Sequence, residues 1–411
     1  MNSDYDIVII GGGLVGTSLA CMLQKQSLRI AIVESVPKEK RLSQKADLRS
    51  IALSHASQKI YATMQIWQSI NEYAAIIEQL HISERGRFAL SRFHASREKL
   101  SALAYVVPFQ RLNQALNDCL STATVDWLCP AQLQSISLRQ DGQYELDLLM
   151  AGKPHKLQTQ LLVAADGSNS AVRRLANIDR KIFDYQQNAI VATIDLMRNH
   201  KNIAYEHFMG DSAIALLPVA PQRCALIWSV PHEKAAALMA LDDAPFIQTL
   251  QKTFGYRAGR FLAISKRHSY PVKLTIAKQF YQQGLVLLGN SAYNLHPIAG
   301  QGFNLNLRDA AVLAQVICEA HAQQQALGSV ALLQRYQSLR EADQKRMIHI
   351  IDYLMRVFTL ELWPATSLRR LGLLVVDGIP PLKHRILQQM FGLSMRASDL
   401  ACGISLDEHL S

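Results

Sequence analysis

The alternation of apolar and polar positions predicts a strand, a helix and a second strand at the start of the chain. Tyr5–Ile10 is a short and mostly apolar run, as expected of a buried parallel strand. Three glycines follow, and apolar residues then recur at helical spacing as far as Leu23. Leu28–Val33 is a second apolar run. Together these runs predict a β-α-β unit.

A group of mainly β patterns occupies the middle of the chain. Apolar runs at 132–138 and 144–149 flank Asp141-Gly142, a pair that is typical of a hairpin turn. Further strand patterns lie at 160–165, 189–194, 213–218 and 224–230, and two short helical patterns follow near 232–240 and 244–254. This order predicts a separate, mainly β lobe within residues 180–280.

The last third of the chain combines one more strand with helices. An apolar run at 284–289 predicts a buried strand, a glycine-rich turn follows, and a helical pattern extends from about Phe303 to His321. Helical patterns continue through 332–362 and beyond. The apolar coverage of 347–362 is broad, and it indicates either packing on the main domain or a docking face for a membrane surface or partner.

Composition and charge narrow the class of protein. The chain has 411 residues, of which 49% are hydrophobic and 18% charged, as expected of a globular protein with a sizeable core. Its net charge of +10 is spread along the sequence without a block of like charges. We therefore expect no nucleic-acid partner, whereas anionic cofactors, anionic lipids or acidic partners suit a basic surface.

Cysteine usage and the N-terminus indicate the compartment. The six cysteines are scattered and form no C-x-x-C pair, which favours a reducing compartment over a disulfide framework or structural zinc. The N-terminus lacks the basic segment and cleavage site of a signal peptide. No apolar run is long enough to span a membrane. We therefore expect a cytoplasmic protein without a metal site.

A glycine motif joins the first strand to the first helix. Gly11, Gly13 and Gly16 form G-x-G-x-x-G, and Glu34 closes the second strand. Such glycines make a tight turn, let the backbone approach a pyrophosphate and let helix and strand pack closely. A carboxylate at the end of the second strand accepts hydrogen bonds from ribose hydroxyls. With its flanking elements, the motif predicts a dinucleotide-binding fold.

Other polar residues stand near the expected ligand edge of this fold. Asp166 closes the strand at 160–165, where it serves as a helix N-cap, as a ligand contact or as both. Arg49 is either a phosphate contact or a solvated surface residue, and the sequence alone favours a structural role for Arg111. The turn after 284–289 presents free N–H groups and a helix dipole to an anionic or electron-rich group.

These three segments together resemble the single-component FAD-dependent aromatic hydroxylases, and among them the ubiquinone-biosynthesis branch. The first is the glycine motif. The second matches D-G-x-x-S-x-x-R at Asp166, Gly167, Ser170 and Arg173. The third resembles H-P-x-A-G-Q-G-x-N-x-G-x-x-D at His296, Pro297, Ala299, Gly300, Gln301, Gly302, Asn304 and Asp309. Three softer strings, at 82–86, 223–228 and 266–271, resemble branch members that act on a prenylated methoxyphenol.

Two positions depart from the pattern of the resembled group. The wider group has Asp after the glycine of its G-D pair, where this chain has Asn290 after Gly289. The later glycine of the signature is replaced by Asn306. An amide at position 290 still donates and accepts hydrogen bonds, but it carries no charge.

The resemblance implies an α/β fold with a Rossmann-like FAD-binding domain, an inserted mainly β substrate domain and a helical C-terminal segment. The expected FAD-binding parts are 1–70, 111–178 and 281–330. The expected substrate-domain parts are 71–110 and 179–280, and the expected C-terminal helical region is 331–411.

The resemblance also implies a role for each candidate site residue. Glu34 would bind the adenosine ribose, and the motif glycines would hold the pyrophosphate. Arg49 would hold the phosphate or ribityl region, while Arg111 and Asp166 would border the cofactor channel. Pro297 would lie beside the flavin on the substrate side, next to His296. The ribityl chain and the edge of the flavin ring would be held by Asn290, Gly300, Gln301, Gly302 and Asn304.

The implied reaction is a ring hydroxylation. No second G-x-G-x-x-G follows residue 16, so NADPH or NADH would dock transiently and reduce FAD. O₂ would then give a flavin hydroperoxide that hydroxylates an electron-rich, prenylated phenol. His296 is a candidate base by location, as are Tyr205, His207, Tyr270 and Tyr293. The expected partners are the phenol, O₂ and a peripheral membrane or biosynthetic-complex contact.

Two alternatives remain open from the sequence. One is an FAD hydroxylase that acts at another ring position or on a small soluble phenol. The other is a non-catalytic FAD-binding scaffold subunit, against which the intact His-Pro-x-x-Gly-Gln-Gly stretch speaks.

Overall fold

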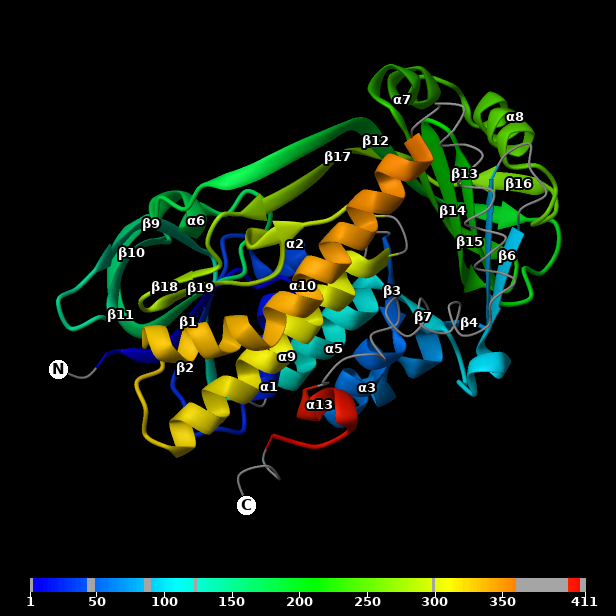
Figure 1. The fold of residues 1–411 in the computed structure, drawn as a ribbon. Coiled ribbons are helices and arrows are strands. Elements are labelled where there is room, and N and C mark those ends of the chain that lie inside the picture. Colours follow the sequence, from blue (N-terminus) through cyan, green and yellow to red (C-terminus); the bar gives the residue numbers. More distant parts are fainter. Residues whose placement is uncertain are drawn as a thin grey trace.

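The computed structural model describes residues 3–42, 49–84, 90–121, 124–297, 300–359 and 398–406. Two large sheets stand at opposite ends of the molecule, and two long strands and a long helix connect them (Figure 1). The part of the predicted C-terminal helical region at 360–397 lies outside the described residues.

The first sheet is built on the predicted β-α-β unit. Its order is β18-β19-β11-β1-β2-β8, and β1, β2, β8, β11 and β19 run parallel. An antiparallel meander of β9, β10 and β11 extends it, as the Asp141-Gly142 turn predicted. The strands are β1 (Tyr5–Ile10), β2 (Ile30–Val33), β8 (Val125–Leu128), β9 (Ala131–Leu138), β10 (Tyr144–Met150), β11 (Lys153–Ala164), β18 (Tyr281–Gln282) and β19 (Leu285–Leu287).

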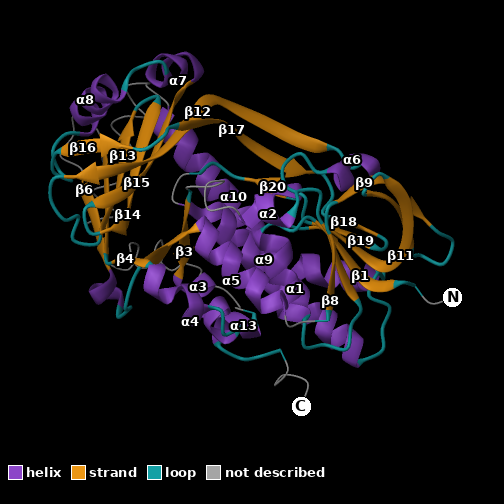
Figure 2. Ribbon diagram, turned by 180° about the vertical axis from the view of Figure 1, so that it is seen from behind, coloured by secondary structure: helices purple, strands orange, loops and turns teal. Residues whose placement is uncertain are grey.

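Alternate residues of β1 face two different cores, as a pleated strand requires. Ile7 and Ile9 pack with buried side chains of α1 (Leu14–Leu23), α5 (Phe109–Ser121) and α9 (Gln301–Ala322). Val8 and Ile10 pack with the meander. Figure 2 shows α1, α5 and α9 in the centre of the molecule, between the two large sheets.

The second sheet is the predicted β lobe. Its order is β20-β17-β12-β15-β14-β13-β5-β6, and β16 pairs with β12. The strands are β5 (Gln79–Glu84), β6 (Leu90–His94), β12 (Arg180–Leu196), β13 (Ile203–Met209), β14 (Ser212–Ala220), β15 (Arg223–Pro231), β16 (Phe261–Ile264), β17 (His268–Ala277) and β20 (Tyr293–Asn294). Helices α7 (His232–Met239) and α8 (Asp243–Phe254) cover its core, which contains Trp228 and Phe246.

A small third sheet lies between the other two. Its order is β3-β7-β4, with β3 at Ser50–Ser54, β4 at Ala75–Ile77 and β7 at Ala104–Pro108. The remaining elements are α2 (Lys38–Leu42), α3 (His55–Thr63), α4 (Trp67–Ile70), η1 (Asn71–Tyr73), η2 (Ala95–Glu98), α6 (Ala171–Leu175), η3 (Gly289–Ser291), α10 (Val330–Thr359) and α13 (Asp399–Cys402). Because 71–110 supplies strands both to this sheet and to the second sheet, the predicted domain boundaries remain our proposal.

Two sequence predictions need adjustment. The strand predicted at 284–289 ends at Leu287, because Gly289 has a φ of +70° and begins the turn η3. The strand predicted at 189–194 is much longer, because β12 pairs with β17 over most of its length. For α10, Met347 and Ile351 are buried in the core beneath the first sheet, so packing on the main domain is confirmed for this part of the helix.

Candidate functional site

The glycine turn between β1 and α1 is packed so tightly that two of its motif glycines have no room for a side chain. A Cβ at Gly16 would lie 2.2 Å from the backbone oxygen of Gly11, and one at Gly11 would lie 2.4 Å from that of Ala165. Gly13 differs, because a Cβ there meets no atom within 4 Å in the described part of the chain. The first and third glycines therefore close the turn against β11, while the second faces open space.

Glu34 reaches from the end of β2 back to this turn. Its Oε2 accepts a hydrogen bond from the backbone N–H of Gly12 at 2.7 Å, and its Oε1 accepts one from Val36 at 2.7 Å. The carboxylate is thus held at the edge of a cavity of about 490 Å³ that Gly11, Gly13 and Asp166 also line. The structure brings these four predicted residues to one cavity.

Arg41 supports the same turn, although no sequence motif singled it out. One of its terminal nitrogens donates to the backbone oxygen of Gly12 at 2.8 Å, and the other donates to Asn117 Oδ1 at 2.9 Å. Its guanidinium carbon lies 4.3 Å from the centre of the Trp127 ring. Burial lowers the pKa of Arg41, and the charge of Glu34 opposes that shift. A lone arginine in a short charged helix offers no periodic signal.

Asp166 is both a helix cap and an open acceptor. Its Oδ2 accepts hydrogen bonds from the backbone N–H groups of Ala171 at 2.6 Å and Val172 at 3.2 Å, at the start of α6. Its Oδ1 is buried and has no hydrogen-bond partner within the described ranges. A buried oxygen without a donor is costly. The free oxygen therefore suits a ligand hydroxyl in the cavity.

Arg173 ties the second sequence motif to the third. Its guanidinium donates to the backbone oxygens of Ser291 at 2.7 Å and Ser168 at 2.8 Å, and the residue is 2% exposed. Ser291 belongs to the turn η3 that follows β19. The arginine of the motif is therefore a positioning residue for the turn after β19.

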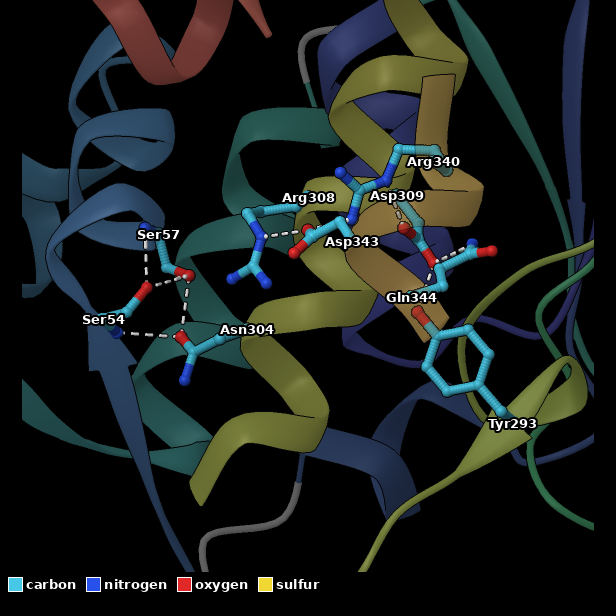
Figure 3. Close-up of polar contacts among 9 residues, drawn as sticks. All are labelled: Ser54, Ser57, Tyr293, Asn304, Arg308, Asp309, Arg340, Asp343 and Gln344. Carbon is cyan, nitrogen blue, oxygen red and sulfur yellow. Dashed lines mark hydrogen bonds and ion pairs between the residues drawn. The ribbon is translucent and has the colours of Figure 1, made fainter. Parts of the chain in front are cut away.

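Asn304 anchors the start of α9 to the third sheet. Its Oδ1 accepts from the Ser54 N–H at 2.8 Å and from the Ser57 hydroxyl at 2.7 Å, while its Nδ2 donates to the backbone oxygens of Ala52 and Gly300. Figure 3 shows the contacts with the two serines. All four side-chain contacts are made within the protein. Asn304 would therefore act on a cofactor by fixing the backbone of the helix start.

The middle of α9 is held by a buried network of charges (Figure 3). Asp309 accepts from Arg340 Nε at 2.5 Å, from Gln344 at 2.9 Å and from the hydroxyl of Tyr293. Arg340 also donates to Asp343 at 2.6 Å, and Arg308 donates to Asp343 at 3.0 Å. Burial opposes the charge on Arg340, but Asp309 and Asp343 outweigh it and raise the pKa of Arg340.

The other predicted residues of the third motif surround the helix start. Gly300 has a φ of +59° and precedes α9, and Gln301 is 3% exposed. Gly302 has open space where a Cβ would project, as judged against the described residues. Asn290 is exposed in η3 and accepts a hydrogen bond from Asn306.

The two predicted arginines lie against aromatic rings. The guanidinium carbon of Arg49 is 5.3 Å from the ring centre of Phe109, and that of Arg111 is 3.9 Å from the ring centre of Tyr73. Both arginines are exposed. Their predicted contacts with a cofactor remain predictions, and the stacking of Arg111 supplies the structural role that its sequence context favoured.

A narrow apolar cavity lies between the start of α9 and the second sheet. Its volume is about 40 Å³, and Glu206 is the one charged side chain among the described residues that line it. Those residues are Ala52, Ser54, Ile77, Leu80, Ala104, Ala204, Glu206, Ala215, Leu217, Ile227, Pro297, Gly300, Gln301 and Asn304. Pro297 also lines a smaller neighbouring space together with Glu206 and His296. The sequence motifs singled out Pro297 and His296, which line this space, but they did not single out Glu206.

His296 is buried beside this cavity. It is 1% exposed, its Nε2 lies 3.4 Å from Gln187 Oε1, and its ring meets that of Tyr185 edge-on. Burial lowers the pKa of His296 to about 3. The imidazole is therefore neutral at pH 7, and it is a weak base for a phenol.

The other base candidates differ in their access to the cavity. Tyr293 is buried, and its hydroxyl donates a hydrogen bond to Asp309. The Tyr205 hydroxyl lies 3.4 Å from the backbone oxygen of Arg257. Tyr270 is 45% exposed. His207 lines the smaller space, and its Nδ1 lies 2.9 Å from both Ser83 Oγ and a terminal nitrogen of Arg257.

The described residues contain neither a cluster of metal ligands nor a membrane-spanning helix. Within them, no three His, Cys, Asp or Glu side chains gather as a metal site. None of the helices in that part of the chain is long and apolar enough to cross a membrane.

Comparisons with known proteins agree with this geometry. A family model described as "FAD binding domain" matches residues 4–350. The chain is 36% identical over 98% of its length to an uncharacterized protein of Synechocystis, covering 97% of that protein. It is 32% identical to the ubiquinone hydroxylase UbiL of Rhodospirillum rubrum, over 94% of this chain and 89% of that protein. The structure of p-nitrophenol 4-monooxygenase PnpA from Pseudomonas putida aligns with a TM-score of 0.78 at 14% identity, over 96% of this chain and all of that one, which shows a shared fold.

Proposed function

Because this chain belongs to the FAD binding domain family, and within it to the flavin-dependent hydroxylases of ubiquinone biosynthesis, we propose that it hydroxylates the ring of a prenylated methoxyphenol. The three short strings at 82–86, 223–228 and 266–271 favour 2-octaprenyl-6-methoxyphenol hydroxylase as the type of enzyme. The observation that carries the proposal is the apolar cavity beside Pro297 with the carboxylate of Glu206 in its wall.

The residues around the crevice fit FAD. Asp166 offers a buried oxygen that awaits a donor, and Gly13 leaves open space at the start of α1 for a pyrophosphate. Glu34 is held where it accepts hydrogen bonds from a ribose. Gly300 and Gln301 stand at the start of α9, and we assign the positive end of that helix dipole to the flavin end of the bound cofactor.

The bound flavin, reduced by NADPH or NADH, supplies the activation of O₂, and the chain supplies position, dryness and proton control. Buried side chains of the third sheet and the substrate sheet, among them Ile77, Leu80 and Ala104, exclude water from the cavity. The start of α9 would stabilise negative charge on the flavin ring of the bound cofactor. Pro297 lines this cavity, and in our proposal it would lie between the flavin ring and the substrate.

Glu206 is our candidate for the residue that recognises the phenol. Its side chain is 6% exposed and lines both the apolar cavity and the space beside His296. A carboxylate there accepts a hydrogen bond from the phenol hydroxyl and takes its proton as the ring becomes electron-rich. We assign the role of base to Glu206, and to neutral His296 the role of orienting the substrate or the turn.

The test compares Glu206→Gln with wild type in the FAD-loaded enzyme. Product carrying one added oxygen is measured by mass spectrometry, alongside NADPH oxidation, with a prenylated methoxyphenol and with the same phenol lacking its tail. We expect E206Q to keep FAD and to form product at least about a hundredfold more slowly. The matched control is Glu233→Gln, at an exposed position in the first turn of α7. Product formation by E206Q within threefold of wild type contradicts the role of Glu206.

The same assay distinguishes the alternatives. Faster turnover of the phenol without a tail favours a small soluble substrate. FAD binding without any product favours the scaffold. We further propose that the enzyme associates with a membrane surface or a biosynthetic complex, because a prenylated substrate partitions into lipid.

A further inference from the structure

Asn290 and Asn306, which stand at the two departures from the family pattern, touch each other. Asn306 Nδ2 donates to Asn290 Oδ1 at 3.1 Å. Asn290 is exposed in the turn after β19, whereas Asn306 lies in α9 and is 3% exposed. Positions that are separated by a whole loop in sequence are therefore one side-chain pair in space.

The backbone around Asn290 restricts where its side chain can point. Gly289 has a φ of +70° and packs against Val15 of α1, where an added Cβ would lie 3.4 Å from the valine side chain. Arg173 holds the carbonyl of Ser291 on the other side. Asn290 is thus clamped at the carboxyl end of the sheet, between the glycine turn and α9, where doubly wound folds hold their cofactor.

The hydrogen bond from Asn306 decides which end of the Asn290 amide faces outward. Because Oδ1 of Asn290 is occupied, its NH₂ group remains directed away from Asn306. No residue in the described part of the chain accepts a hydrogen bond from that NH₂ group. The exposed end of the pair is therefore a neutral donor.

We propose that Asn306 is a positioning residue that presents the Asn290 amide as a hydrogen-bond donor to a ribityl hydroxyl of FAD. The pair replaces a carboxylate acceptor by an amide donor and removes a negative charge beside the flavin. A neutral neighbour disfavours the anionic reduced flavin less than a carboxylate does. The inference rests on FAD binding and not on the proposed substrate, so failure to hydroxylate a prenylphenol leaves it intact.

The stability of the apoprotein separates this role from a merely structural one. Oδ1 of Asn306 is buried and has no hydrogen-bond partner among the described residues, and such an orphan acceptor costs stability. Ala also has a higher helix propensity than Asn. Replacing Asn306 by Ala is therefore expected to leave the melting temperature of the apoprotein unchanged or higher, while FAD binding weakens.

The experiment is a double-mutant cycle with Asn290→Ala, Asn306→Ala and the double variant. FAD affinity is measured from quenching of flavin fluorescence by apoprotein. We expect each single change to weaken FAD binding about tenfold and the double change to weaken it no further, because the two side chains act as one unit. A third variant, Asn290→Asp, keeps the acceptor for Asn306, and its flavin midpoint potential is expected to be more negative than that of wild type.

The matched control is Asn202→Ala, which removes a side-chain contact of 3.2 Å to Glu78 in the substrate lobe and leaves FAD binding unchanged. FAD affinity of N306A within twofold of wild type, or losses that multiply to about a hundredfold in the double variant, would overturn the proposal. Loss of the apoprotein fold in N306A would also count against it, provided that Asn306→Gly, which restores the residue of the family pattern, fails in the same way. An unchanged midpoint potential in N290D would refute the electrostatic part.

Discussion

The two ends of the proposed cofactor site are built in different ways. At the glycine turn, the residues that shape the site lie within one β-α-β unit, and Gly16 meets Gly11 directly. At the start of α9, the shape depends on residues far away in sequence, such as Ser54 and Arg340. The glycine turn is formed by backbone packing within one β-α-β unit, whereas the start of α9 is held by residues that are distant in sequence.

The difference shows in where the polar groups lie. Glu34 has hydrogen bonds to backbone groups and remains at the surface of its cavity. Asp309, Arg340 and Asp343 are at most 5% exposed and satisfy one another. A buried ion pair carries a large desolvation cost, which is repaid only while all partners are present. The α9 end should therefore be the more fragile of the two.

The largest expected effect comes from breaking the α9 network. Asp309→Asn keeps the shape of the side chain but leaves Arg340 with less compensating charge, so we expect a loss of about 3–5 kcal/mol in the free energy of unfolding. Urea denaturation of the apoprotein measures it. The control is Lys345→Met, because its pair with Glu341 is exposed and should contribute less than about 1 kcal/mol. If D309N and K345M lose the same stability, the network is not what holds this end.

Replacing glycines of the glycine turn is expected to have the next largest effect. The two replacements should differ, because one impairs stability and the other impairs FAD binding. Gly16→Ala places a Cβ 2.2 Å from a backbone oxygen, and we expect it to destabilise the apoprotein by about 3 kcal/mol. Gly13→Ala has room in the described structure, so the apoprotein should keep its stability while FAD affinity falls tenfold or more. Thermal melting and FAD titration measure both. A G13A protein that binds FAD like wild type would mean that the pyrophosphate does not approach this glycine.

The same contrast explains what the sequence could predict. Periodicity and turn chemistry are local properties of the sequence. They are sufficient to predict the β-α-β unit, the hairpin at Asp141-Gly142 and the β lobe. Asp166 and the start of α9 were found because their motifs lie at strand ends, where such folds bind ligands. Gly11, Gly13, Glu34 and Asp166 do line one cavity.

The residues that escaped prediction act over long distances. Arg41 reaches the glycine turn from α2, and Glu206 lines the apolar cavity only because β13 lies where the second sheet meets α9. The contact between Asn290 and Asn306 depends on the geometry of η3 against α9. No pattern in one sequence records such pairings, since each requires the completed tertiary structure.

The pH dependence of stability tests whether His296 is buried as a neutral imidazole. The pKa of His296 in the folded protein is about 3, below the ordinary value of about 6.5. As the pH falls, this imidazole is therefore protonated in the unfolded chain before it is protonated in the folded protein. This contribution to stability is present above pH 6.5 and is lost as the pH falls toward 3. Between pH 7 and pH 5, this residue should account for about 2 kcal/mol of lost stability. Apoprotein of His296→Gln should therefore lose about 2 kcal/mol less than wild type over that range, and equal losses would contradict a buried neutral imidazole.

Replacing Arg111 is expected to have the smallest effect on stability, and it tests whether this residue belongs to the cofactor channel. Its guanidinium carbon lies 3.9 Å from the Tyr73 ring centre, and both side chains lie toward the surface. An exposed cation–π contact contributes about 0.5–1 kcal/mol. Arg111→Met should therefore cost no more than this in apoprotein stability, and Tyr73→Leu should cost the same without adding to it. FAD titration of R111M then assigns the residue. An affinity within twofold of wild type leaves Arg111 a structural residue of α5, whereas a tenfold loss that Y73L does not share makes it part of the cofactor channel.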